Sequence, residues 1–426
     1  MLLNQVSKNL AVVLILCGFS SQVFAGGYMF SELGELSTST AGAGSAAVAE
    51  GAEAAFVNPA GMVRLKGKHI ATNLGLLNLD STYYDMGSNV VGGHESSFKE
   101  TSLKKLLPIG SFYFTNEIDD KSSFGIAMGA TGGSGFGYGS GFSGSIMAQD
   151  GLLLTAQLNP SVAYKVNDKL SLGIGVSAEM AYINQTLNTT AIDGGLNVID
   201  GEISADDISF GWNIGVMYQF SDANRIGFAY RSQIEHELEG DLALKVEGRY
   251  IGLPSGKSSL PAQVNVIMPA QVKLSGYHVV KNNVALLWTL GWQDLSAVQQ
   301  TDVIVHGSNS PIIRSWKDTY STAIGGHFKI NKSLRFELGY SYETSPQDDP
   351  TKINVDVPTG PISKYSTGLT WFINEAMKAQ FYYEHLDGNS VRTQAPDNLT
   401  NGDLTQLNGV YDLNVHFVGA VLNYAF

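Results

Sequence analysis

Hydrophobic and polar residues alternate along most of this chain, most clearly in its last twelve residues, VHFVGAVLNYAF. Every second residue back from Phe426 is apolar or aromatic, namely Tyr424, Leu422, Ala420 and Val418. The residues between them are mostly small or polar, with Val421 and Phe417 as exceptions. A period of two places the two sets on opposite faces of a strand. The segment favours the closing strand of a β-barrel in lipid, with an aromatic residue at the membrane interface, although strands of soluble sandwiches also alternate.

The same period recurs inside the chain. Apolar residues occupy every second position in three internal runs, which are Leu334 to Tyr342, Leu170 to Ala178 and Ile226 to Tyr230. Charged residues such as Arg335 and Glu337 take alternate positions, and a charge facing lipid would cost about 2–4 kcal/mol at mid-bilayer, so we expect them to face a lumen. The alternatives are a solvated face of a soluble sheet and a repeat fold such as a propeller, for which we find no recurring motif.

Short polar turns separate these runs and give a strand count. Asn and Asp suit such turns because they tolerate left-handed backbone and bond locally. The turns are Asp119-Asp120-Lys121, Asn167-Asp168, Ser221 to Asn224, Lys281-Asn282-Asn283, Asn331-Lys332 and Asn374-Glu375. Each interval between turns holds two runs of strand length and one longer irregular segment. Adding a first strand near His69–Tyr84 and the last strand predicts an all-β, transmembrane antiparallel β-barrel of 14 strands, with short periplasmic turns and long extracellular loops.

The N-terminal segment reads as a secretory signal peptide. Lys8 is the only charged residue among the first 25, and the apolar run Leu10 to Leu16 precedes the cleavage-like tripeptide Val23-Phe24-Ala25. Cys17 is the only cysteine, and the large Leu16 before it argues against a lipoprotein signal. We therefore predict removal of residues 1–25, which leaves a mature chain without disulfides or a thiol nucleophile.

Residues 26–67 do not follow the strand pattern. They are rich in Ala, Gly, Ser and Thr, and small residues allow backbone to pack in confined space. Apolar anchors are spread along the segment, at Phe30, Leu33, Leu36, Val48, Phe56 and Met62. We predict a small N-terminal plug (hatch) inside the lumen, followed by the barrel over residues 68–426. The alternative is a flexible periplasmic extension.

Charge and motifs exclude several classes. The net charge of −13 becomes −14 once Lys8 is lost, which argues against nucleic acid and anionic lipid surfaces as partners. No serine has glycine two residues before and two after it, so the hydrolase elbow is missing. His236-Glu237 begins like a zinc-protease motif but lacks the second histidine, and there is no phosphate-binding loop. We expect no enzyme activity, no cofactor and no metal.

Several short motifs along the chain carry a further signal. The clearest is Asn58-Pro59-Ala60 within AAFVNPAGM, which resembles the plug motif of the FadL/TodX family of outer-membrane transporters. Others follow in the family's order, namely Met268-Pro269-Ala270, Trp292 to Ser296, Trp316 to Tyr320, Ser345-Pro346, Val357-Pro358 and Asn423 to Phe426. Residues 85–260 match weakly. The likeness rests on the order and positions of these motifs together.

The resemblance implies a plugged barrel of 14 strands in the outer membrane of a Gram-negative bacterium. It implies extracellular capture of a long-chain fatty acid or another hydrophobic compound, then lateral release through a kink in the third strand. Candidate kink residues are Gly129, Gly132, Gly133 and Gly135, because glycine permits bulges, although the Gly-rich run could equally be an extracellular loop. It further implies outer-membrane lipid and lipopolysaccharide as surroundings, assembly by the barrel-assembly machinery with Tyr424 and Phe426 as the insertion signal, and a monomer.

A fatty acid also needs a cation for its carboxylate. Inward-facing candidates are Arg225, Arg231, Lys273, Arg335 and Lys378, together with Lys317 in a family-like segment. The alternative for each is a lumen salt bridge that holds the plug or the wall. The resemblance implies that the mature N-terminus is a gate that touches ligand, with the residues Gly26, Gly27, Tyr28, Met29 and Phe30. The alternative for these residues is an extended core of the hatch.

The leading hypothesis is a passive transporter of long-chain fatty acids or similar hydrophobic compounds. One alternative is an aromatic hydrocarbon uptake channel. Another is a surface adhesin or receptor that uses long loops near Glu239–Pro261 and Leu386–Asn408. A barrel lipase is disfavoured because the catalytic pattern is missing.

Overall fold

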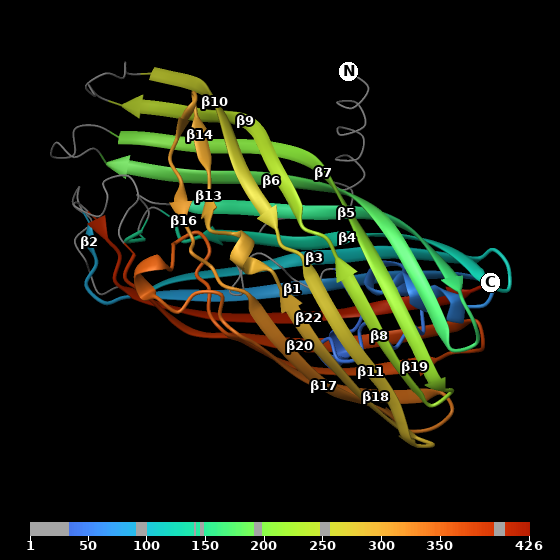
Figure 1. The fold of residues 1–426 in the computed structure, drawn as a ribbon. Coiled ribbons are helices and arrows are strands. Elements are labelled where there is room, and N and C mark those ends of the chain that lie inside the picture. Colours follow the sequence, from blue (N-terminus) through green and yellow to red (C-terminus); the bar gives the residue numbers. More distant parts are fainter. Residues whose placement is uncertain are drawn as a thin grey trace.

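A closed antiparallel β-barrel forms the body of the protein, as a computed structural model shows (Figure 1). The structure describes residues 34–90, 100–139, 142–144, 149–190, 198–247, 256–395 and 405–426. The wall contains β1 (Lys68–Asp85), β3 (Glu100–Glu117), β4 (Ser122–Gly137), β5 (Asp150–Lys165), β6 (Leu170–Thr190), β7 (Val198–Ser221), β8 (Asn224–Arg231), β9 (Ile234–Glu247), β10 (Gly256–Met268), β11 (Gln271–Lys281), β12 (Val284–Gln293), β17 (Thr319–Lys329), β18 (Leu334–Glu343), β19 (Ile362–Phe372), β20 (Met377–Thr393) and β22 (Gly409–Ala425).

The wall has 14 strands, as the turn count predicts. Two of them are interrupted: β7 pairs with both β8 and β9, while β9 and β8 pair in turn with β10 and β11. The second interruption falls at Pro269-Ala270, where proline has no N–H for the ladder. The barrel closes between its first and last strands, with a register that runs from His69↔Ala425 to Asp85↔Gly409.

All six predicted turns lie between consecutive wall strands. Four are closed by a side chain that accepts two backbone N–H groups, and the acceptors are Asp119, Asn167, Asn331 and Asn374. Such turns are local, so the sequence alone specifies them. We call this side of the barrel the turn end and the opposite side the loop end.

The loop end carries short extra elements. They are β2 (Asn89–Val90), η3 (Leu295–Ala297), β13 (Gln300–Thr301), β14 (Val303–Val305), β15 (Ser308–Asn309), β16 (Ile312–Ile313), η4 (Pro350–Lys352) and β21 (Thr405–Gln406). β14 pairs with the edge of β10, and Figure 1 shows β13, β14 and β16 between β10 and the strands below it. The bounds predicted for the loops at Glu239–Pro261 and Leu386–Asn408 are too wide. β9, β10 and β20 extend far into both ranges and pair with their neighbours there.

The two faces of the wall differ as the alternation predicts. On the last strand Val418 and Leu422 are about half exposed, whereas Phe417 and Val421 are buried inside. On β18 the apolar set from Phe336 to Tyr342 faces outward, and Arg335 and Glu337 are buried in the lumen. An outward apolar belt and inward charges are what a lipid environment requires. No helix in the described part of the chain is long and apolar enough to cross a membrane.

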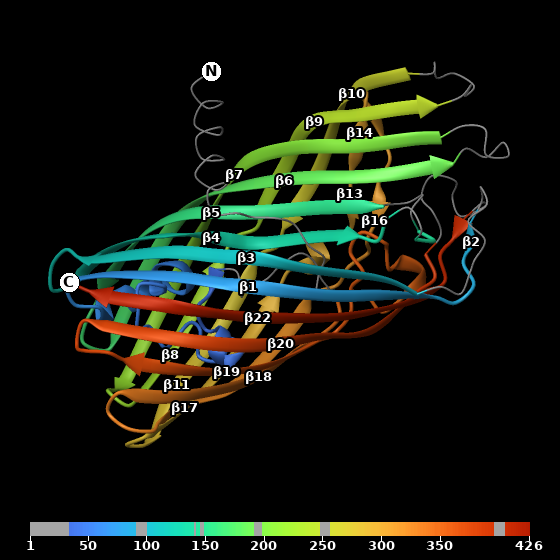
Figure 2. The same cartoon turned by 180° about the vertical axis from the view of Figure 1, so that it is seen from behind.

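Residues 34–67, which we call the plug, pack against the inner wall. They contain η1 (Thr38–Thr40), α3 (Ala54–Val57) and η2 (Pro59–Arg64), drawn in blue towards the turn end in both views (Figures 1 and 2). Two wall glycines permit the close approach: a Cβ on Gly227 would overlap the carbonyl oxygen of Ala46, and a Cβ on Gly339 would overlap that of Thr40.

Candidate functional site

The plug motif is a hydrogen-bonded junction between the plug and the wall. Asn58 is buried, and its Oδ1 accepts the N–H of Ala60 at 3.2 Å, which caps η2. Its Nδ2 donates to the carbonyl oxygens of Ala46 at 2.7 Å and Val216 at 3.2 Å. Pro59 occupies the first helical position, where no backbone N–H is needed. Asn58 therefore ties two parts of the plug together and both of them to β7.

Five basic residues predicted to face the lumen do so, and all five contact the plug. Arg225 donates to the carbonyl oxygens of Ala47 and Val48 at 2.6 and 2.7 Å. Arg231 donates to that of Phe56 at 2.9 Å. Lys273 and Arg335 bond to the carboxylates of Glu35 and Glu50, and Lys378 donates to the backbone carbonyl oxygen of Glu50 at 2.9 Å. These contacts match the alternative given for each residue, in which its charge holds the plug and does not bind the carboxylate of a ligand.

Lys317 lies apart from this set. Its side chain is 58% exposed at the loop end and forms an ion pair with Asp348. The N-terminal gate residues Gly26, Gly27, Tyr28, Met29 and Phe30 lie outside the described residues, so their contact with ligand stays a prediction.

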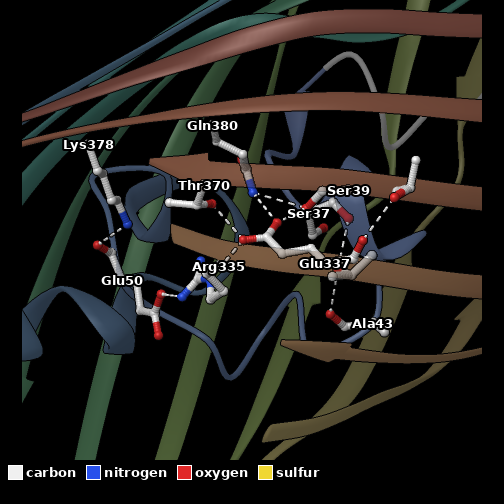
Figure 3. A network of polar contacts seen from close by, with 11 residues as sticks. Ser37, Ser39, Ala43, Glu50, Arg335, Glu337, Thr370, Lys378 and Gln380 are labelled. Atoms are coloured by element: carbon white, nitrogen blue, oxygen red, sulfur yellow. Dashed lines mark hydrogen bonds and ion pairs between the residues drawn. The ribbon is translucent and has the colours of Figure 1, made fainter. Parts of the chain in front are cut away.

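Figure 3 shows a network of polar contacts between plug and wall. Glu337 of β18 accepts hydrogen bonds from Ser39 of the plug, from Thr370 at 2.6 Å and from Gln380 at 2.5 Å. Arg335 joins it to the plug, because its guanidinium donates to Glu337 at 2.8 Å and to Glu50 at 2.6 Å. Four donors to one buried carboxylate fix this side of the plug firmly.

The pKa values of two plug carboxylates beside this network are shifted in opposite directions. Burial raises the pKa of Glu50, but the charges of Arg335 and Lys378 outweigh burial and hold that pKa well below its ordinary value. Burial also raises the pKa of Glu53, and Lys378 offsets this only in part, so that pKa stays above its ordinary value. Both glutamates line a polar cavity of about 60 Å³ between the plug and the wall.

The third wall strand leaves its neighbour half-way along. The β3–β4 ladder ends at Ser111↔Gly129, whereas β4 stays paired with β5 as far as Gly137↔Asp150. The register with β5 shifts between Ala130 and Gly132, which marks a bulge at Thr131. Gly129, Gly132, Gly133 and Gly135 all lie within this paired strand, so the alternative of an extracellular loop is wrong. The four glycines thus stand at and beyond the point where β4 departs from β3.

Apolar side chains fill the lumen between the plug and the loop end. They belong to one buried cluster whose members include Leu77, Leu79, Leu103, Leu107, Ile109, Phe136, Leu386, Leu413, Val415 and Phe417. Four aromatic rings, those of Tyr83, Tyr138, Phe142 and Tyr411, pack together in the same cluster with centroids 4.7–6.0 Å apart. Water-filled barrels have a polar interior, so this lumen suits apolar molecules.

A second cavity, of about 50 Å³, lies beside this cluster and has mixed chemistry. Its lining is mainly apolar, with Leu153, Val264 and Val357 among its residues. Arg314 also lines it and bonds to both carboxylate oxygens of Asp356, with Nη1 to Oδ1 at 2.7 Å. No local pattern in the sequence marks this buried arginine as a site residue, because its partner Asp356 is 42 residues away in another loop segment.

Comparison with known proteins identifies the family. The family model described as outer membrane protein transport protein (OMPP1/FadL/TodX) matches residues 16–426. The chain belongs to this family. Among its relatives, outer membrane protein P1 of Haemophilus influenzae is 25% identical, with 93% of this chain and 95% of the relative covered. The long-chain fatty acid transport protein of Escherichia coli is 22% identical, with 88% and 90% covered.

Solved structures of the FadL/TodX family share the fold. A Pseudomonas aeruginosa FadL homologue superposes with a TM-score of 0.84 at 20% identity, over 94% of this chain and all of that chain. The Pseudomonas putida toluene transporter TodX gives a TM-score of 0.67 at 15% identity, with 88% and 94% covered. The protein is therefore a Gram-negative outer-membrane β-barrel of a family that transports hydrophobic compounds. In such barrels the turn end is periplasmic and the loop end extracellular.

The C-terminal aromatic residues lie at the turn end of the barrel, on its outer surface. Tyr424 and Phe426 are 38% and 69% exposed on the outer surface, with their rings edge to face at 4.7 Å. The N–H of Phe426 donates to the carbonyl oxygen of Lys68, which joins the two ends of the barrel. Their role in membrane insertion stays a prediction.

Proposed function

We propose that this protein carries long-chain fatty acids, or closely similar hydrophobic compounds, passively across the outer membrane. The observation that carries the proposal is the apolar inner surface that reaches the end of the β3–β4 ladder. Leu103, Leu107 and Ile109 of β3 are buried on the lumen side, at positions where β3 has no β4 partner. An alkyl chain held by the lumen cluster would therefore lie next to a stretch of wall whose ladder is interrupted.

The energetics of this route need no coupled energy source. Each buried CH₂ group stabilises the bound chain by about 0.8 kcal/mol, so an apolar lumen extracts an alkyl chain from water. Release sideways between β3 and β4 would place the chain in lipid, where the same groups stay buried. We propose lateral release at Gly129 to Gly135, with the predicted gate residues Gly26–Phe30 contacting the ligand on its way to this opening.

The carboxylate of a fatty acid needs a cation in or near the lumen. Arg314 is the candidate that we add, because it lines a mainly apolar cavity and its charge is already balanced by a carboxylate, Asp356, that a ligand carboxylate could replace. The five plug-bound basic residues and Lys317 remain candidates that would have to exchange their present partners. The relatives named as long-chain fatty acid transport proteins support this choice of substrate.

A second candidate is uptake of aromatic hydrocarbons. It is favoured by the buried ring cluster around Tyr83 and Tyr411 and by the engagement of all five inward-facing basic residues with the plug. Such a substrate would need no cation. For either substrate we propose a monomer that is folded by the barrel-assembly machinery and surrounded by outer-membrane lipid and lipopolysaccharide.

Uptake of labelled oleate and labelled toluene tests these proposals in cells that lack their own transporter. Barrel folding is confirmed first, by the mobility difference between heated and unheated samples in detergent gels. We expect oleate uptake that is lost on deletion of Gly26–Phe30 and reduced in Arg314→Gln. Uptake of toluene alone would support the hydrocarbon channel. A folded barrel that takes up neither compound would contradict transport of both and favour a surface receptor.

A further inference from the structure

A buried polar cluster lies beside the bulge of β4, apart from the residues predicted from the sequence to form the site. Its centre is Glu179 of β6, whose side chain is 2% exposed. Oε2 of Glu179 accepts hydrogen bonds from Thr131 Oγ1 at 2.6 Å and from Gln157 Nε2 at 3.2 Å. Thr131 is the residue at which the β4–β5 register shifts. The bulge residue is therefore tethered to a carboxylate two strands away across the lumen side of the wall.

The other oxygen of Glu179 is held by a histidine. His236 of β9 has a fully buried side chain, with Nε2 at 3.2 Å from Glu179 Oε1 and Nδ1 at 2.8 Å from Asp207 Oδ2. With both carboxylates ionised, each can only accept, and both ring nitrogens then carry a proton to satisfy the two contacts. The geometry therefore favours a charged imidazolium between the two carboxylates. A neutral ring would keep only one of the two bonds.

Among the described residues, two carboxylates contact the His236 ring. Glu179 faces it from β6 and Asp207 from β7, while Val266, its register partner on β10, is apolar. Arg231 of β8 is a further charged neighbour of the cluster, because it donates a hydrogen bond to Gln157 and interacts electrostatically with Glu179. Loss of the imidazolium proton would therefore leave Glu179 and Asp207 facing an uncharged ring, and the tether of Glu179 would weaken.

The cluster also contacts the plug. Arg231, which binds Gln157, donates to the carbonyl oxygen of Phe56 and lies 4.2 Å over the Phe56 ring. The Phe56 ring packs on Gly34, and a Cβ on Gly34 would lie 3.0 Å from the carbonyl oxygen of Ala130, next to the bulge. A continuous set of contacts therefore joins the plug to the bulge of β4.

We propose that Glu179, held by protonated His236, is the positioning residue that keeps β4 bent away from β3 and so sets the width of the lateral route. Thr131 transmits this position to the strand. The proposal rests on the proposed function for its consequence in transport, but the position of β4 can be measured without any substrate. Loss of the His236 proton at high pH removes one of its two hydrogen bonds, loosens Glu179 and allows β4 to return towards β3.

The test is a distance between spin labels in the complete folded protein in lipid vesicles. Labels are placed at Leu106→Cys on β3, which is exposed, and at Gly137→Cys, the last residue of β4. Thr131→Val keeps the shape of the side chain but cannot donate to Glu179. Loss of a hydrogen bond to a charged group should raise the ratio of unbent to bent β4 about tenfold. Thr131→Ser keeps the hydroxyl and should restore the native distance.

Thr370→Val is the matched control. Thr370 is also a buried threonine that donates to a glutamate at 2.6 Å, but its partner is Glu337 in the network on the other side of the plug. It should leave the distance between the labels unchanged. A Thr131→Val distance equal to that of the native protein, or a Thr370→Val shift of the same size, would overturn the proposal.

His236→Gln tests the proton. The native protein should shift towards the short β3–β4 distance as the pH is raised from 6 to 9. The His236→Gln variant should show one distribution at all pH values, and a pH shift that persists in it would rule out His236 as the sensor. If oleate is the substrate, Thr131→Val should also lower the maximal uptake rate with little change in half-saturation. An unchanged distance together with reduced uptake would overturn the positioning role and leave the transport proposal intact.

Discussion

Asn58→Ala should release the plug without unfolding the barrel. The substitution removes one hydrogen bond that caps η2 and two that reach Ala46 and Val216. At about 1 kcal/mol for each bond, the seated plug should lose roughly 3 kcal/mol. Since 1.4 kcal/mol is tenfold in an equilibrium constant, the open population should rise by about two orders of magnitude. The wall makes its own closed ladder, so its stability should change little.

Hydrogen–deuterium exchange measured by mass spectrometry separates these two outcomes. Peptides from residues 38–65 should exchange about 100-fold faster in the variant, whereas peptides from β6 and β7 should keep their native rates. Asn167→Ala is the matched control, since Asn167 accepts two backbone N–H groups at 2.9 and 3.0 Å in an exposed turn. Its plug should exchange at the native rate. Equal acceleration of exchange in wall and plug peptides, or no acceleration in Asn58→Ala, would contradict a role of Asn58 in holding the plug alone.

Three further outcomes are expected from the plug and the chain end. Burial raises the pKa of Glu53, so the protonated side chain stabilises the seated plug fully below the ordinary pKa of 4.5. This stabilisation is lost as the pH rises through the raised pKa. Glu53→Gln should therefore flatten the pH dependence of plug exchange. Gly339→Val should displace the plug, because its Cβ would overlap the carbonyl oxygen of Thr40, and native protease resistance of residues 38–65 in this variant would contradict that packing. Phe426→Ala should reduce the folded fraction in outer membranes severalfold in heat-modified gels, whereas Phe381→Ala, another outward aromatic residue, should not.

The plug network also has a consequence for ligand choice. Every inward-facing basic residue named from the sequence is engaged with the plug, at Glu35, Glu50 or backbone carbonyl oxygens. If any of them binds a substrate carboxylate, it must leave a plug partner to do so, and binding would then loosen the plug. Oleate should therefore accelerate plug exchange if these residues are its site, and should leave it unchanged if Arg314 is.

Local and periodic features were predictable from the sequence. The turns at Asp119 and Asn331 depend on side chains that bond within three residues, so no distant contact is needed to form them. The inward position of Arg335 follows from its place between Leu334 and Phe336 in an alternating run. The bounds predicted for the loops after Glu239 and Leu386 are too wide, because polar residues in a strand that extends beyond the membrane resemble loop residues in the sequence.

A period of two and six local turns suffice to specify the barrel, its strand number and the side chains that face lipid, so these features can be predicted from the sequence. The partners of the buried charges, in contrast, are known only from the folded structure. Arg225 and Lys378 meet plug carbonyl oxygens 177 and 328 residues away in the chain, and His236 meets Glu179 57 residues away. Such pairings depend on how the closed wall and the plug face each other in three dimensions. No local pattern encodes them, since each partner alone reads only as a polar residue on the lumen face.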